Sequence, residues 1–129
     1  MTLIARFAIE QARPGQVADL DADWLGVMVF SKVFTAGIVG SATTVFLSAG
    51  TEEGSRSYVA TERILGRTED GRSGAVTVQH GGLESDPASW FGHIVPHTGT
   101  GDFAGWSGSA RIRHDDEGAY FEIDLDPPG

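Results

Sequence analysis

The sequence predicts an all-β protein that folds as a single antiparallel barrel of eight strands. The 129 residues include 18 glycines, which are spread along the chain rather than clustered and so indicate many turns. The segments between these glycines are short and rich in Val, Ile, Thr, Phe and Tyr, which favour strands. No stretch repeats apolar residues at helical spacing for more than one turn. Eight such strands suit a closed up-and-down barrel, because closure removes exposed sheet edges.

The expected strands follow one another at short intervals along the chain. They are residues 3–9, 25–35, 38–49, 56–65, 74–80, 89–95, 109–114 and 119–124. Three connections, 49–57, 67–74 and 114–119, place Asp or Glu next to Gly, which is typical of hairpin turns that need a positive φ. The connection 11–24 is longer and contains Pro14-Gly15, so we expect it to cross one end of the barrel. Two prolines end the last strand, since proline cannot continue a ladder.

Composition limits the classes of partner and chemistry. A content of 40% hydrophobic residues, with 3 tryptophans and 7 phenylalanines, is enough for one core, so residues 1–129 are predicted to form a single domain. The net charge of -9 repels phosphate backbones and anionic lipids, which makes nucleic acid and membrane surfaces poor partners. The absence of cysteine excludes a disulfide, a thiolate nucleophile and a Cys-containing zinc site. The sequence has no recognisable signal peptide or membrane span, so we expect a cytoplasmic protein.

The run 94–108, IVPHTGTGDFAGWSG, superficially matches a dinucleotide-binding loop through Gly99, Gly101 and Gly105. Such a loop works when it follows a parallel strand and opens a helix whose N-terminus holds the phosphates. Here Gly105 and Gly108 disfavour a helix, and a strand pattern resumes by Ser109. We therefore expect a sharp corner of the barrel and no nucleotide cofactor.

Two groups of residues bear on metal binding. His93 and His97 are four residues apart, which on a strand separates them by about 13 Å, too far to share one ion. Asp19, Asp21 and Asp23 form an acidic cluster in the connection 11–24, but the glycine and the distal glutamate of an EF-hand loop are absent. A solvated loop is the simpler interpretation, so no metal site is predicted.

Two segments resemble the bacterial DUF3224 family. They are 58–82, YVATERILGRTEDGRSGAVTVQHGG, and 94–112, IVPHTGTGDFAGWSGSARI. The shared features include Glu62-Arg63, the turn 71–74, Gln79-His80-Gly81 and the glycines that follow Pro96. The resemblance implies an eight-stranded barrel of the allene oxide cyclase-like type. Members of that group enclose small apolar molecules, and several steer cyclisation without a cofactor.

This sequence departs from the family pattern at His97, where a small residue, often glycine, is usual. We interpret the imidazole either as neutral drift or as a group added at the mouth of a pocket, and His97 is therefore a candidate ligand-binding residue.

Side-chain alternation along a barrel strand selects candidates for the interior. In the strand 56–65, the set that contains Tyr58 and Glu62 combines an aromatic ring with a carboxylate, and we expect this set to face a cavity. An unpaired buried carboxylate has a raised pKa, as a general acid or base near neutral pH requires. The alternative is a structural ion pair between Glu62 and Arg63, Arg72 or another basic side chain.

Histidines supply two further catalytic candidates. In the strand 74–80, the alternation of branched apolar residues points His80 inward near one rim, where it would act as a base or bond a backbone carbonyl. In the strand 89–95, Trp90, Gly92 and Ile94 form one face and Phe91, His93 and Val95 the other, so either face could be inside. Rings expected in the core or around a cavity are Trp90, Phe91, Phe30, Phe34 and Phe46. A Ser-His-Asp triad has no support, because no G-x-S-x-G elbow occurs.

Three functions remain open at this point. The first is a cofactor-independent isomerase or cyclase for a small apolar or polyunsaturated molecule, with shape holding a reactive conformer and Glu62 or a histidine moving a proton. The second is a non-catalytic carrier or sensor of a similar ligand. The third is an oligomeric structural barrel with a filled interior. The volume of the interior separates the third function from the other two.

Overall fold

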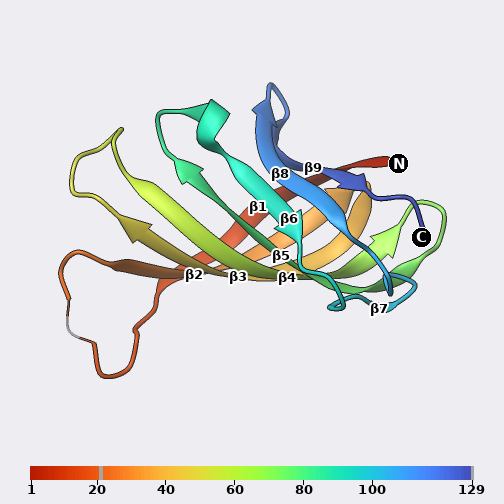
Figure 1. Cartoon of the computed structure of the whole chain (residues 1–129), viewed down its shortest axis with the longest axis horizontal. Coiled ribbons are helices and arrows are strands. Elements are labelled where there is room, and N and C mark those ends of the chain that lie inside the picture. Colours follow the sequence, from red (N-terminus) through yellow and green to blue (C-terminus); the bar gives the residue numbers. More distant parts are fainter. Residues whose placement is uncertain (21, 129) are drawn as a thin grey trace.

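The computed structural model describes residues 1–20 and 22–128, and within them the chain forms nine strands and a short 3-10 helix (Figure 1). These elements are β1 (Thr2–Pro14), β2 (Gly26–Ala36), β3 (Ile38–Ala49), β4 (Ser57–Thr68), β5 (Ser73–Leu83), η1 (Pro87–Ser89), β6 (Phe91–Ile94), β7 (Thr100–Gly101), β8 (Gly108–Asp115) and β9 (Gly118–Leu125). No helix in these two ranges is long and apolar enough to cross a membrane.

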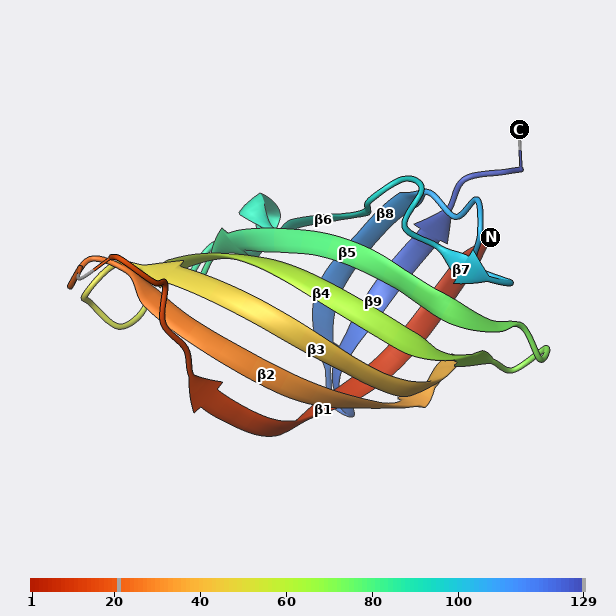
Figure 2. The same ribbon diagram turned by 90° about the horizontal axis from the view of Figure 1, so that it is seen from below.

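Eight of the strands close into an antiparallel barrel. The strand order runs β4-β3-β2-β1-β9-β8-β6-β5, and a further pairing between β4 and β5 joins the two edges of the sheet. The two-residue strand β7 pairs with β5 outside this ring. Figure 2 shows the long, strongly coiled strands β2 to β5 on one side of the barrel and β6, β8, β9 and β1 on the other. The predicted all-β barrel of eight antiparallel strands is therefore confirmed.

Each predicted strand has a counterpart, but β1 is longer than expected. It continues to Pro14 because it pairs with β2 from Arg6↔Ala36 to Pro14↔Met28, with two shifts of register on the way. Proline is tolerated at this position because it is the last residue of the strand. Apolar and polar residues do not alternate clearly in residues 10–14, so the sequence did not predict this part of β1. It is a strand because it pairs with β2. The predicted connection 11–24 is shortened accordingly.

The two ends of the barrel differ. Both chain termini, the β2–β3 and β4–β5 turns and the connection from β6 to β8 lie at one end, which we call the filled end (Figure 1). The β1–β2, β3–β4, β5–β6 and β8–β9 connections lie at the other end, which we call the open end. The buried apolar cluster comprises Leu3, Ala5, Phe34, Ile38, Ala42, Ile64, Val76, Val78, Ile94, Phe103, Trp106, Ala110, Phe121 and Ile123.

The glycine-rich run supplies the plug of the filled end. Phe103 and Trp106 are buried, and their rings stack with centroids 3.9 Å apart. A Cβ atom added at Gly99 would lie 1.9 Å from the carbonyl oxygen of Phe103, so the fold of this connection requires glycine at that position. The next regular element is the strand β8, not a helix, so this segment is a corner of the barrel, as predicted, and lacks the helix of a nucleotide-binding loop.

Candidate active site in the open end of the barrel

Two adjoining pockets, both open to solvent, lie at the open end, and together they are called the cavity below. The inner part has a volume of about 490 Å³ and reaches down to Phe7, Lys32, Thr44, Tyr58 and His80. The outer part has a volume of about 370 Å³, and Tyr58, Ile112 and His114 line both parts. Tyr58 thus lies where the two parts meet.

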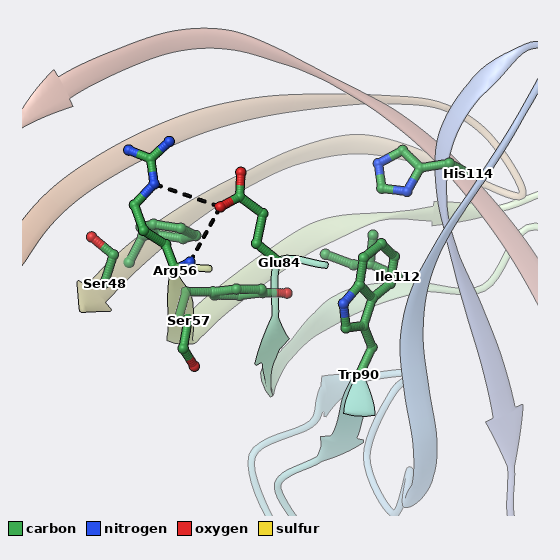
Figure 3. Close-up of a pocket in the computed structure, with 9 residues that line it drawn as sticks. Ser48, Arg56, Ser57, Glu84, Trp90, Ile112 and His114 are labelled. Carbon is green, nitrogen blue, oxygen red and sulfur yellow. Dashed lines mark hydrogen bonds and ion pairs between the residues drawn. The ribbon is translucent and has the colours of Figure 1, made fainter. Parts of the chain in front are cut away.

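The outer part has mostly apolar walls and a charged rim (Figure 3). Trp90 donates its indole N–H to the carbonyl oxygen of Leu83 at 2.7 Å, which fixes the ring, and its ring meets that of His114 edge to face at 5.7 Å. At the rim, the Nε atom of Arg56 lies 3.6 Å from Oε2 of Glu84. A ligand entering here would pass an ion pair and then contact aromatic rings.

Three strands bring the polar groups of the floor together. On β4, Ala60, Glu62 and Ile64 are buried and Tyr58 is half-buried, so the predicted inward face of this strand is confirmed. His80 on β5 is 2% exposed, so it points inward as predicted. Lys32 on β2, which only β3 separates from β4, is 5% exposed and reaches the same carboxylate.

These side chains form a continuous chain of hydrogen bonds. The Nζ atom of Lys32 donates to Oε1 of Glu62 at 2.8 Å. The Nε2 atom of His80 lies 2.9 Å from the same oxygen, and Nδ1 of His80 lies 2.9 Å from the hydroxyl oxygen of Tyr58. The result is a line of groups, Tyr58 to His80 to Glu62 to Lys32, that begins at the cavity wall and ends in a buried ion pair.

The charge states follow from burial and pairing. Burial alone would raise the pKa of Glu62, but the hydrogen bond from His80 and the charge of Lys32 outweigh it and hold the pKa below its usual value. Burial lowers the pKa of Lys32, and the attraction of Glu62 opposes this effect. Burial, together with the negative charge of Glu62, raises the pKa of Tyr58 to about 12. Tyr58 is therefore a protonated phenol at neutral pH.

The direction of each hydrogen bond follows from these states. An ionised carboxylate only accepts, so Nε2 of His80 carries the proton that it donates to Glu62. With the imidazole proton on Nε2, Nδ1 is an acceptor, and the Tyr58 hydroxyl donates to it. The unpaired-carboxylate hypothesis for Glu62 is thus wrong, and the ion-pair alternative holds with a partner other than the two named arginines. Arg63 instead bonds Thr77 and Thr98, and Arg72 pairs with Asp70.

Two buried oxygens of the floor, Oε2 of Glu62 and Oγ1 of Thr44, have no hydrogen-bond partner among the described residues. The two residues face each other across β3 and β4 in register. A buried polar group without a partner destabilises a fold. Such groups therefore indicate a site whose residues serve a function and not stability. Both oxygens belong to the group of buried polar side chains beneath the cavity.

The remaining candidates divide by location. The rings of Phe30 and Phe46 are tilted by 54° with centroids 5.1 Å apart, and both line the cavity together with Trp90, while Phe34 is buried in the core at 1% exposure. Tyr58 stacks on Phe46 at 4.7 Å, which joins the polar chain to this apolar wall.

The structure corrects the expected placement of Phe91, His93 and His97. Phe91 is 43% exposed and His93 is also exposed, because Gly92 and Ile94 form the inner face of β6. A Cβ atom added at Gly92 would lie 1.8 Å from the carbonyl oxygen of Ala110, so only glycine fits where β6 meets β8. His97 is exposed in the β6–β8 connection at the filled end, away from the cavity.

Sequence reasoning missed Lys32, Thr44 and Phe7. Lys32 left one usable trace, since it is a single charge within the apolar strand pattern 25–35. Thr44 has no such trace, because threonine is ordinary in a strand.

No group of three or more His, Asp or Glu side chains that could hold a metal ion occurs among the residues that the structure describes. One member of the predicted acidic cluster, Asp21, lies outside those residues.

The fold and the site together define a closed eight-stranded antiparallel barrel with one filled end and a solvent-open cavity at the other. The chain belongs to the DUF3224 family, described as a protein of unknown function, whose family model matches residues 3–126. It is similar to the crystal structure of a protein with unknown function from the DUF3224 family of Shewanella oneidensis MR-1, with 26% sequence identity, a TM-score of 0.78 and 98% of each chain covered. A search of curated proteins found no match.

Proposed function

We propose that the protein binds a small, largely apolar molecule in the open end and moves a proton on it, as a cofactor-independent isomerase or cyclase. The observation that carries this proposal is the hydrogen-bonded chain from Tyr58 through His80 to Glu62, whose first member lies at the cavity wall. A purely structural ion pair between Lys32 and Glu62 would not need the two further members.

The proton path uses the chain in order. When a bound molecule gives a proton to the oxygen of Tyr58, the hydroxyl proton of Tyr58 passes to Nδ1 of His80, 2.9 Å away. The imidazolium formed in this way lies 2.9 Å from the Glu62 carboxylate, which stabilises it as the carboxylate of a catalytic triad does. No phenolate forms, so the raised pKa of Tyr58 does not oppose the transfer.

The walls supply the rest of the catalysis. Phe30, Phe46 and Trp90 surround the path with rings that exclude water and hold one conformer of a flexible ligand. The resemblance to allene oxide cyclase-like barrels favours the same class of reaction, because members of that group steer cyclisation without a cofactor. The open cavity argues against an oligomeric barrel with a filled interior.

A probe of known chemistry tests the proposal. A base removes the ring C–H proton of 5-nitrobenzisoxazole while its N–O bond breaks, which releases a coloured nitrophenolate. We expect the protein to accelerate this reaction, and Tyr58→Phe or Glu62→Gln to reduce the rate about 10²-fold or more. Tyr120→Phe is the matched control. Tyr120, on β9, contacts Arg6 of β1 and does not line the cavity.

The competing outcomes are distinct. Binding of the neutral fluorophore N-phenyl-1-naphthylamine without any acceleration of the proton transfer would identify a carrier. A Tyr58→Phe variant as active as the parent chain would remove Tyr58 from the mechanism. If the protein neither binds the fluorophore nor accelerates the reaction, the proposal fails.

A further inference from the structure

The proton path runs through Tyr58, His80 and Glu62 and does not include Lys32. It is the only lysine in the chain, and every other basic side chain apart from the histidines is an arginine. An arginine would serve equally well or better in a buried ion pair, because its guanidinium is weakly hydrated and binds carboxylates with two hydrogen bonds. The single lysine stands instead at the floor of the cavity, where an amine has chemistry that a guanidinium lacks.

The surroundings of the Lys32 amine are apolar on all sides but one. Its side chain is 3% exposed, and Nζ lies 4.2 Å from the ring centroid of Phe7 and 5.3 Å from that of Phe121. The bond to Glu62 is its only side-chain hydrogen bond within residues 1–20 and 22–128. Lys32 and Phe7 both line the inner part of the cavity, which opens to solvent at the open end.

We propose that Lys32 forms an imine with the carbonyl group of an aldehyde or ketone bound in the cavity. This inference rests on the proposed function in one respect, since it assigns a substrate class to the same cavity.

The step balances without an oxidant or a cofactor. The ammonium of Lys32 gives a proton to Glu62, and the amine lone pair then forms a C–N bond as the carbonyl π electrons move to oxygen. A proton shifts from nitrogen to that oxygen, which gives a carbinolamine. Glu62 returns its proton to the hydroxyl group, the C–O bond breaks with loss of water, and the nitrogen lone pair forms C=N. One ammonium and one carbonyl become one protonated imine and one water.

The site suits this sequence of steps. Burial lowers the pKa of Lys32, so less free energy is needed to reach the neutral, nucleophilic amine than in water. The protonated imine keeps both the positive charge and an N–H group, so the pairing with Glu62 survives and no buried charge is left alone. The imine also withdraws electrons from the adjacent C–H bonds, and the Tyr58 hydroxyl lines the same inner cavity, where it can accept such a proton.

Reductive trapping tests the inference on the wild-type chain. The protein is incubated with 2-naphthaldehyde and sodium cyanoborohydride, which reduces an imine to a stable secondary amine, and the adduct is located by peptide mass spectrometry. We expect labelling at Lys32 to be at least about tenfold faster than labelling at the N-terminal amine, the only other amine of the chain. An excess of 2-methylnaphthalene, which has the same ring but no carbonyl, should slow labelling at Lys32 alone.

Two results would overturn the inference: labelling confined to the N-terminus, or equal rates at both amines with no effect of 2-methylnaphthalene. Lys32→Arg is the matched variant, since it keeps the charge but cannot form an imine, and its internal adduct should be absent. The peptide map of the wild-type chain decides the question even if this variant does not fold. Failure here is distinguishable from failure of the proposed function, because 5-nitrobenzisoxazole has no carbonyl group and tests the proton path alone.

Discussion

The filled end of the barrel holds the stacked rings of Phe103 and Trp106, whereas the open end has a solvent-open pocket of about 490 Å³ beside rings that are only partly buried. The same eight strands build both ends, so strand composition alone does not explain the difference. At the filled end the β6–β8 connection folds inward and fills the barrel. At the open end the β3–β4 and β8–β9 turns contain no buried residue (Figure 1).

A layer of polar side chains lies between these two regions. Lys32, Thr44, Glu62 and His80 are all buried, with the apolar cluster on one side and the cavity on the other. A polar layer of this kind lowers stability relative to apolar packing unless every group is paired, and two of its oxygens are not. Apolar packing at the filled end therefore stabilises the fold and offsets the destabilising effect of the cavity and the charged floor at the open end.

The largest expected effect breaks the filled end. Phe103→Ala removes a fully buried ring and leaves a void against Trp106, so the free energy of unfolding should fall by about 4 kcal/mol. Phe46→Ala, at the open end, removes a ring that already borders the cavity and should lower it by only about 1 kcal/mol. Urea denaturation of the two variants makes the comparison. Equal losses would show that the two ends are packed alike.

The second prediction concerns the polar layer. Lys32→Met leaves the Glu62 carboxylate buried without its cation, and the free energy of unfolding should fall by about 3 kcal/mol. The double variant Lys32→Met with Glu62→Gln removes both charges and retains an acceptor for His80, so it should recover at least about half of that loss. A double-mutant cycle in urea measures the coupling. If the two losses simply add, Lys32 and Glu62 do not stabilise each other.

The sequence was informative where period-two alternation applies. It predicted the eight strands, and on β4 and β5 it placed Glu62 and His80 inside, because alternation requires only local information. It did not predict the contact between Lys32 and Glu62, which are 30 residues apart and lie on the two strands that flank β3. This contact depends on the register of β2, β3 and β4, and a single sequence does not encode register in any local pattern.

The plug was missed for a related reason. Phe103 and Trp106 lie in a glycine-rich connection, and connections are expected at the surface because their backbone groups need partners. Here that requirement is met, since the Asp102 carboxylate accepts from Ser73 N–H and the N–H of Asp102 donates to the carbonyl oxygen of Ser73. The connection is therefore free to bury its rings. No property of the residues themselves distinguishes this loop from an exposed one.

The third prediction sharpens the description of the cavity wall. The pKa of Tyr58 is raised from its usual 10.0 to about 12, so the folded state holds this proton more tightly than the unfolded state. The stabilisation is complete below pH 10 and is lost as the pH rises towards 12, which should lower the free energy of unfolding by about 1–2 kcal/mol after allowance for partial exposure. Comparison with Tyr58→Phe isolates the effect, because the lowered pKa of Lys32 acts with the opposite sign in both chains.

A spectroscopic titration checks the same pKa directly. The chain has 2 tyrosines, so in a Tyr120→Phe variant the ultraviolet absorbance of phenolate reports Tyr58 alone. We expect its midpoint near 12; a midpoint near 10 would mean that Tyr58 is fully solvated and not part of the buried chain.

The smallest expected effect is at His97, in the corner of the filled end. His97 has a φ of +66°, in the left-handed region where a side chain is strained and glycine is not. The backbone of the corner therefore favours glycine at this position. His97→Gly should raise the free energy of unfolding by about 0.5–1 kcal/mol in urea denaturation. His97→Ala keeps the Cβ atom and the strain, so it should bring no gain; if alanine stabilises as much as glycine does, the imidazole rather than the backbone is the source of the effect.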